Sequence, residues 1–186
     1  MPMKEILKHY SPRCEQEKEA LKRIDSLENN FDNLLYREND YAHYTSSTFI
    51  INKDRTKVLF INHKLYDAWG WVGGHMDGED DFRAVALKEA QEETGLKNLE
   101  FLSEEVASVD ILPVVGHLKN NKWVSPHVHL SLSFVLIADE NEKLVKNEEE
   151  TNGVQWFEIS ELDKVVKEEH MLPIYNKLKE FSEGQK

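Results

Sequence analysis

A carboxylate-rich helix that follows a pair of glycines constrains this chain more than any other feature. The stretch from Asp81 to Thr94 contains no proline or glycine and consists largely of strong helix formers, and Gly95 supplies a C-terminal stop. These residues predict a helix of about four turns. Just upstream, Gly73 and Gly74 predict a turn between a short strand and this helix.

Acidic residues continue the apolar stripe of the predicted helix. At about 100° per residue, three apolar side chains share one face with three carboxylates, namely Phe82, Val85, Ala86, Glu89, Glu92 and Glu93. Carboxylates at this spacing repel one another, and placing them on a partly buried face is costly unless a cation is bound there. Oxygen-only ligands suit a hard divalent cation. For the helix alone, an ordinary solvated face is the alternative.

Together with the upstream glycines, the stretch resembles the signature of the Nudix hydrolases. That signature is Gly, five residues, Glu, seven residues, Arg-Glu, an aliphatic residue, any residue, Glu-Glu, any residue, Gly and an aliphatic residue. The matching positions fall in register without a gap: Gly74, Asp80, Lys88, Glu89, Ala90, Glu92, Glu93, Gly95 and Leu96. Asp80 replaces Glu and Lys88 replaces Arg, so the charges keep their signs. Because Lys lacks the bidentate contact of Arg with a carboxylate, we expect a weaker brace between helix and loop.

The resemblance implies a divalent-metal-dependent hydrolase acting on a nucleoside diphosphate linked to another moiety. Water would attack phosphorus and cleave the pyrophosphate bond. The implied catalytic residues are Glu89, Glu92, Glu93, Asp80 and Lys88. The implied ligands of Mg²⁺ or Mn²⁺ are Glu89, Glu92 and Glu93, with the carbonyl of Gly73. Glu89 is one candidate base, and in many relatives the base or an extra ligand comes from a loop before the last strand, where Glu148, Glu149 and Glu150 lie.

Several other side chains are weaker candidates for substrate binding. His127 and His129 are two residues apart on a predicted strand and so face the same side, where they could flank phosphate or metal, as could His75 beside the glycines. Structural histidines are more common than such ligands. The full weak set is His75, His127, His129, Glu149 and Glu150. The indoles of Trp69, Trp71 and Trp123 could stack on a base, although buried core aromatics are more frequent.

The order of elements along the chain indicates an α+β fold. Residues 1–40 predict a helical extension, because Ser11 and Pro12 suit a helix start and apolar residues recur at helical spacing. Strands are expected over 46–52, 57–63, 69–72, 99–110, 127–138 and 154–159, and closing helices over 160–166, capped by Ser160, and 173–181. The resemblance implies a Nudix-type α/β/α sandwich with a mixed β-sheet. We expect the Nudix domain, with its closing helix, to occupy residues 41–186.

The composition of this chain limits the partners and the cellular location that we expect for it. A formal net charge of −12 over 186 residues argues against a nucleic-acid polymer as partner, whereas a small nucleotide-type substrate can enter when divalent cations neutralise both sides. Cys14 is the single cysteine, which excludes an intrachain disulfide and a cysteine-rich zinc site. Since neither a signal peptide nor a membrane-length apolar run is found, we expect a cytoplasmic protein without a membrane partner. A homodimer stays open.

Two other functions are considered. Isopentenyl-diphosphate isomerase shares the Nudix fold but uses an active-site cysteine, and Cys14 lies ahead of the expected domain, which argues against it. A nucleotide-sensing module without hydrolysis is disfavoured by the retained glutamates but kept open by the changes at Asp80 and Lys88. The sequence does not name the substrate: ADP-ribose, nucleotide sugars, dinucleotides and nucleoside triphosphates all stay open.

Overall fold

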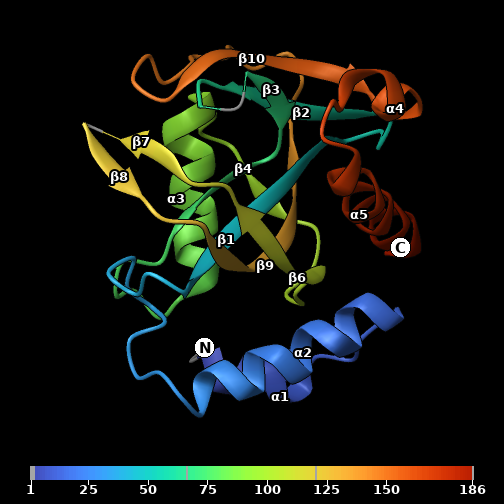
Figure 1. Cartoon of the computed structure of the whole chain (residues 1–186). Helices are drawn as coiled ribbons and strands as arrows, with labels where there is room; N and C mark the ends of the chain where they lie inside the picture. The colour runs from blue at the N-terminus through green and yellow to red at the C-terminus, as the bar shows by residue number, and fades with distance from the viewer. Residues whose placement is uncertain (1–2, 66, 120, 186) are drawn as a thin grey trace.

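The computed structural model describes residues 3–65, 67–119 and 121–185, and within them eight strands form one mixed sheet (Figure 1). The central order is β10-β2-β1-β9-β5, with β3 beside β2, β4 beside β1 and β6 beside β9. These strands are β1 (Ala42–Asn52), β2 (Lys57–His63), β3 (Ala68–Gly70), β4 (Val72–His75), β5 (Glu100–Phe101), β6 (Ser108–Val114), β9 (His127–Ala138) and β10 (Thr151–Glu158). A separate hairpin consists of β7 (His117–Lys119) and β8 (Lys122–Val124).

Helices cover both faces of the sheet. They are α1 (Met3–His9), α2 (Glu15–Glu28), α3 (Phe82–Thr94), α4 (Leu162–Val165) and α5 (Leu172–Gly184), with 3-10 turns η1 (Ile159–Glu161) and η2 (Glu169–Met171). Figure 1 shows the sheet between α3 and α5, with α1 and α2 packed below. None of the helices in the described residues is both long and apolar enough to cross a membrane.

Strand β1 lies at the centre of the sandwich. It runs parallel to β9 over its whole length, whereas its pairs with β2 and β4 are antiparallel. All its residues are buried because both faces are covered. Phe49 packs towards Tyr175 of α5, while the neighbouring Ile50 packs in the cluster that contains Ala90 of α3. The predicted α/β/α sandwich with a mixed sheet is confirmed.

Helix α3 forms where the sequence predicts it. The Asp81 carboxylate caps its first turn by accepting from the backbone N–H groups of Arg83 and Ala84. At the other end Gly95 adopts a left-handed conformation with φ of 74°, which glycine reaches without steric cost. The cap and the stop together fix the register of the acidic residues on this helix.

The N-terminal extension differs from the expected helix pattern. Helix α2 begins after Cys14 rather than at Ser11 and Pro12, because the Arg13 backbone N–H donates to the Glu17 carboxylate. It ends at Glu28, since the side-chain amides of Asn29 and Asn30 donate to backbone carbonyls one turn earlier. The following residues to 40 form turns, bends and irregular chain, so the expectation of helix there is wrong.

Several predicted boundaries also change. The strand expected over 46–52 begins at Ala42, since its polar first half pairs with β4 and β9. The strand expected over 99–110 is interrupted, and residues 102–107 lie between β5 and β6. Strand β10 starts at Thr151 and ends at Glu158, and the helix expected over 160–166 shortens to α4 without a side-chain cap from Ser160. Hairpin β7–β8 was not predicted.

A buried ionic cluster ties the extension to the core. The Lys177 ammonium on α5 lies 2.6 Å from Asp110 of β6 and 3.2 Å from Glu17 of α2. Both carboxylate side chains are fully buried. The Ser108 hydroxyl lies within hydrogen-bonding distance of both carboxylates and donates its one proton to either of them. Three elements far apart in the sequence therefore meet at one set of charges. The division at residue 40 into extension and domain stays a proposal.

Candidate functional site

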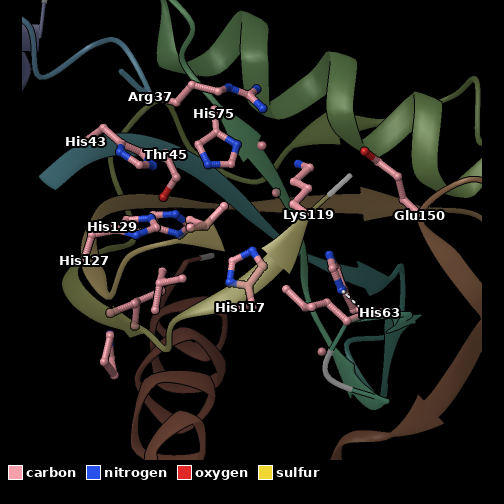
Figure 2. Close-up of a pocket in the computed structure, with 18 of the residues that line it drawn as sticks. Arg37, His43, Thr45, His63, His75, His117, Lys119, His127, His129 and Glu150 are labelled. Carbon is pink, nitrogen blue, oxygen red and sulfur yellow. Dashed lines mark hydrogen bonds between the residues drawn. The ribbon is translucent and has the colours of Figure 1, made fainter. Parts of the chain in front are cut away.

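A cavity of about 860 Å³ lies over the polar half of the sheet (Figure 2). Its floor comes from alternating side chains of β1, and β4, β9 and the hairpin β7–β8 add to its walls. Figure 2 shows His43, His127 and His129 on one side of the cavity and Glu150 on the other. The labelled lining residues are Arg37, His43, Thr45, His63, His75, His117, Lys119, His127, His129 and Glu150.

Gly73 and Gly74 lie within strand β4 and not in the turn predicted from the sequence, and they let α3 and β1 approach this strand closely. A Cβ atom on Gly74 would lie 2.3 Å from Cδ of Glu89, and one on Gly73 would lie 2.6 Å from Oγ of Ser47. No side chain larger than hydrogen fits these contacts without movement. Gly74 therefore lets the Glu89 side chain lie directly against the β4 backbone, and Gly73 allows the close approach of β1.

Glu93 is the most perturbed group at the acidic end of the cavity. Its side chain is buried, and Oε2 has no hydrogen-bond partner. Burial, with the neighbouring carboxylates of Glu150 and Glu89, raises the pKa of Glu93 to about 8, although the Gly73 backbone N–H opposes the change. Burial also raises the pKa of Glu89, which the Lys88 ammonium partly offsets. The carboxylates of Glu89, Glu93 and Glu150 thus lie close together, and one buried oxygen of Glu93 has no hydrogen-bond partner.

The rest of the signature lies at the rim. The side chain of Glu92 is 55% exposed, and the Lys88 ammonium lies 3.8 Å from it and 3.6 Å from Glu89. Asp80 is exposed, and its backbone N–H donates to the Glu79 carboxylate. Among the ion pairs of the described residues, Lys88 pairs with glutamates of its own helix and not with Asp80. The expected brace between Asp80 and Lys88 is therefore not formed.

A group of imidazoles occupies the other side of the cavity. The ring centroids of His43 and His129 are 4.9 Å apart, and the His75 ring lies 5.0 Å from each. The His127 ring lies 4.7 Å from that of His43. Burial, with the nearby Arg37 charge and the neighbouring rings, lowers the pKa of His75 to about 3 and that of His129 to about 2. Burial likewise lowers the pKa of His43. Burial thus favours the neutral form of all three rings.

Other predicted residues lie around the opening. Glu149 and Glu150 both line the cavity, but Glu150 is the one that faces Glu93. The Trp123 side chain on the hairpin is 65% exposed and lines the cavity. Trp69 instead packs edge-on against Phe157. Trp71 lines the cavity wall, while Cys14 is not among the lining residues.

Sequence reasoning missed His43 and Arg37. The signal for His43 was an alternation on β1, where His43, Thr45 and Ser47 share the cavity face. That pattern was hidden because the strand was expected to begin at residue 46. Arg37 lies in the turn region before β1 and forms two hydrogen bonds with the Asp77 carboxylate, a contact between distant segments that no local pattern predicts.

Comparison with known proteins identifies the family of this chain. The family model of the NUDIX domain matches residues 42–178. A curated relative, Nudix hydrolase 25 of Arabidopsis thaliana, is 30% identical over 118 residues, which cover 58% of this chain and 66% of that protein. The chain thus spans slightly less than two thirds of the length of this relative.

Solved structures share the fold at low sequence identity. An Ap4A hydrolase of C. elegans, crystallised as a binary complex, matches with a TM-score of 0.57 at 17% identity, covering 76% of this chain and 98% of that one. A Nudix hydrolase of M. smegmatis, RenU, gives a TM-score of 0.56 at 14% identity, with 77% and 88% covered. The dihydroneopterin triphosphate pyrophosphohydrolase of E. coli gives 0.54 at 16% identity, with 75% and 94% covered.

Proposed function

This chain belongs to the NUDIX domain family, and we propose that it hydrolyses the pyrophosphate bond of a nucleoside diphosphate linked to another moiety. The observation that carries the proposal is the environment of Glu93. A buried carboxylate with an unpartnered oxygen, next to the carboxylates of Glu89 and Glu150, is costly without a cation. The cost is removed if the site binds a divalent metal ion.

The donor set fits Mg²⁺ or Mn²⁺. The groups that would hold the ion are the carboxylates of Glu89 and Glu93, with Glu92 and Glu150 beside them, and we keep the carbonyl of Gly73, which the sequence suggests, as a further candidate ligand. All are oxygen donors, which hard divalent cations prefer. When bound, such an ion lowers the pKa of water and neutralises charge on phosphoryl oxygens.

The remaining side chains have roles that follow from their positions. Gly74 holds Glu89 against β4, and Lys88 offsets part of the repulsion between Glu89 and Glu92. Glu150 faces the cavity from the loop before β10, where a carboxylate can accept the proton of an attacking water. We therefore propose Glu150 as the general base, with Glu89 as the other candidate.

The cavity suits a ligand of nucleotide size. Its volume of about 860 Å³ lies in the range of small-molecule sites. Lys119 and Lys122 on the hairpin bring cationic groups to its wall, where they can neutralise phosphate charge. The exposed Trp123 indole offers a face on which a nucleobase can stack.

The test is a hydrolysis screen with Mg²⁺ and with Mn²⁺. The panel contains ADP-ribose, nucleotide sugars, dinucleotides and nucleoside triphosphates. It also contains Ap4A and dihydroneopterin triphosphate, because two of the structural neighbours carry these compounds in their names. Reaction in H₂¹⁸O places the label in the phosphate product if water attacks phosphorus. We expect Glu93→Gln to abolish metal-dependent turnover, while the exposed Glu180→Gln on α5 keeps it. Wild-type turnover in Glu93→Gln or in excess chelator contradicts the proposal.

The same screen separates the enzyme from a nucleotide-sensing module. The exposed Asp80 and its missing contact with Lys88 are the features that favour a sensor. A sensor binds a panel member in a calorimeter without releasing product. The cytoplasmic location and the homodimer stay predictions, which localisation of a tagged chain and sedimentation analysis test directly.

A further inference from the structure

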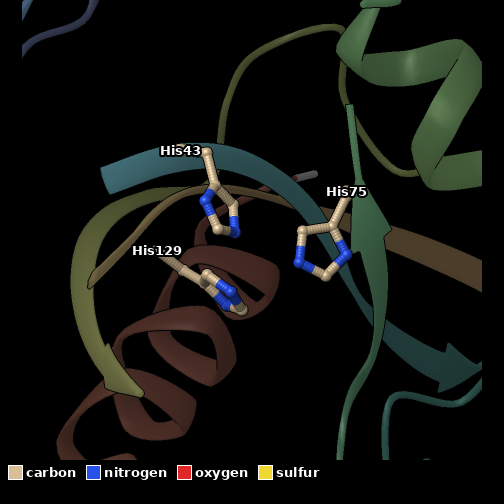
Figure 3. A group of neighbouring side chains, drawn as sticks. All are labelled: His43, His75 and His129. Carbon is tan, nitrogen blue, oxygen red and sulfur yellow. The ribbon is translucent and has the colours of Figure 1, made fainter. Parts of the chain in front are cut away.

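We propose that His43, His75 and His129 form a second metal site in this cavity, for a borderline transition-metal ion such as Zn²⁺. This site is separate from the carboxylate site of the proposed function, and neither depends on the other. Each residue offers one imidazole nitrogen, and the three nitrogens lie within 4.8 Å of one another. Figure 3 shows the three rings facing a common space.

The sheet brings the three residues together from distant parts of the chain. His43 of β1 and His129 of β9 are register partners on neighbouring parallel strands, so their side chains leave the same face of the sheet. His75, the last residue of β4, is the register partner of Thr45, two residues beyond His43 on the same face. The rigid centre of the sheet therefore positions all three rings.

The separation of the nitrogens is close to what a metal requires. A tetrahedral zinc site with Zn–N bonds of about 2.0–2.1 Å places its nitrogens roughly 3.4 Å apart. The nitrogens here lie within 4.8 Å of one another, so each pair has to approach by no more than about 1.4 Å, a distance that side-chain rotations can cover. Preorganised strands with small ring movements are a suitable scaffold for a metal ion.

The tautomer of His43 gives the strongest support. Its Nδ1 lies 3.1 Å from the backbone carbonyl of Asn39, a contact that requires Nδ1 to carry the proton and donate. Nε2 then bears a lone pair, and this atom is buried without a hydrogen-bond partner. Most buried side-chain nitrogens with a structural role have a hydrogen-bond partner. A carbonyl on one nitrogen and an unpaired lone pair on the other is the usual arrangement of a metal-ligating histidine.

The chemistry of the donors selects the ion. Three neutral imidazoles suit Zn²⁺ and related transition metals rather than Mg²⁺, which prefers oxygen. The Asp77 carboxylate pairs with Arg37 and so screens the Arg37 charge from the site. All three histidines line the cavity, so a fourth coordination position opens towards it. Three protein ligands with one open position is the pattern of zinc sites that bind an exchangeable ligand.

The experiment measures zinc binding by the full chain. The Glu93→Gln variant removes a ligand of the proposed carboxylate site, and we expect it to retain one tightly bound Zn²⁺ after dialysis. His75→Gln and His129→Gln each are expected to weaken zinc affinity by at least about tenfold, in line with the loss of a ligand. His117→Gln is the matched control, because His117 lines the same cavity from the hairpin but lies outside the three-histidine group. Circular dichroism verifies that each variant is folded.

A crystal of the wild-type chain soaked in Zn²⁺ locates the ion independently of any variant. Anomalous differences measured above and below the zinc absorption edge are expected to show a peak between the three rings. A peak only at the glutamates, or no peak, overturns the proposal. Zinc affinity that is unchanged in folded His75→Gln and His129→Gln, or is lost in Glu93→Gln alone, overturns it as well. Hydrolysis with Mg²⁺ is measured separately, so failure of this site is distinguishable from failure of the proposed function.

Discussion

The buried carboxylate of Glu93 makes stability depend on pH in a predictable direction. Its pKa is about 8 in the metal-free fold, against an ordinary value of 4.5. Folding favours the protonated form of the Glu93 carboxyl. The stabilisation that this gives the fold is fully present below pH 4.5, and it is lost as pH rises towards about 8. Glu93→Gln cannot ionise and avoids the loss.

We therefore expect metal-free Glu93→Gln to melt above wild type at pH 8, by roughly 5 °C or more, and to match it at pH 4. Divalent metal binds the ionised site and should raise the wild-type midpoint at neutral pH more than at acidic pH. Thermal unfolding in chelator and in Mg²⁺ measures both effects, with Glu180→Gln as the control. Equal midpoints of wild type and variant at pH 8 would falsify the assigned burial.

The two glycines of the site predict different outcomes when each becomes alanine. A Cβ on Gly74 meets the flexible end of Glu89, which can move, whereas a Cβ on Gly73 meets the backbone oxygen of Ser46 at 2.9 Å. We expect Gly74→Ala to stay folded but lose metal-dependent turnover on the order of 100-fold, since a displacement of about 1 Å in a catalytic group has such effects. Gly73→Ala should lower the unfolding midpoint instead. Urea denaturation and turnover are measured for both variants. A Gly74→Ala variant with full activity contradicts the role proposed for Gly74.

Individual site residues were predictable from the sequence only where they belong to a helical pattern. Glu89 and Glu93 fall on the buried stripe of α3, as periodicity indicates. Glu92 sits on the same stripe by angle but is 55% exposed, because periodicity does not reveal where the packed sheet ends. The orphaned nitrogen of His43 depends on a carbonyl in the irregular segment before β1, which no sequence pattern locates.

At the scale of elements, the capping residue of α3 carries a prediction of its own. Asp81 accepts from two backbone N–H groups at 3.0 and 3.2 Å, whereas Asp80 beside it is exposed. We expect Asp81→Ala to lower the free energy of unfolding by about 1 kcal/mol. Asp80→Ala should change it by less than about 0.5 kcal/mol. Urea denaturation of both variants measures the difference, and equal losses would show that the cap does not stabilise the helix.

Elements with a strong local pattern were predicted with correct bounds, and those that depend on pairing were not. Strands β2 and β9 are runs rich in apolar and β-branched residues that end in polar turns, so both bounds were predicted. Residues 42–45 at the start of β1 are polar on the cavity face and lie outside the strand that the sequence predicts. Hairpin β7–β8 is short and exposed, and its turn uses Asn121 at φ of 59°, which leaves little hydrophobic signal.

For the whole molecule, the contacts between distant elements are what sequence reasoning leaves out. Glu17 occupies a helix with many charged residues, where a solvated position is the natural expectation. Its side chain is instead fully buried against Lys177 and Asp110. The partner surfaces come from α5 and β6, and nothing local to α2 indicates that they meet it. The N-terminal extension therefore contacts charged groups from the middle and from the C-terminal end of the chain.

We expect Lys177→Met to destabilise the fold by about 3–5 kcal/mol, because it leaves two buried carboxylates without their cation. Burial opposes ionisation of Glu17, but the Arg13 backbone N–H and the Lys177 ammonium outweigh it and lower the pKa of that carboxyl below 4.5. The wild-type protein therefore keeps the stabilisation from ionised Glu17 above pH 4.5 and loses it as pH falls further. The deficit of the variant should accordingly be largest near neutral pH and shrink in acid, where the Glu17 carboxylate takes up a proton.

Urea denaturation at neutral and acidic pH measures this deficit. Lys179→Met is the matched control on the same helix, since the Lys179 ammonium lies 4.0 Å from Glu183 and both side chains are well exposed. That change should cost less than about 0.5 kcal/mol. Adding Asp110→Asn to Lys177→Met removes one orphaned charge and should restore part of the stability, while turnover of the folded protein stays unchanged because neither residue lines the cavity. A deficit equal to that of Lys179→Met, or one that does not vary with pH, would show that the extension is held by its apolar contacts alone.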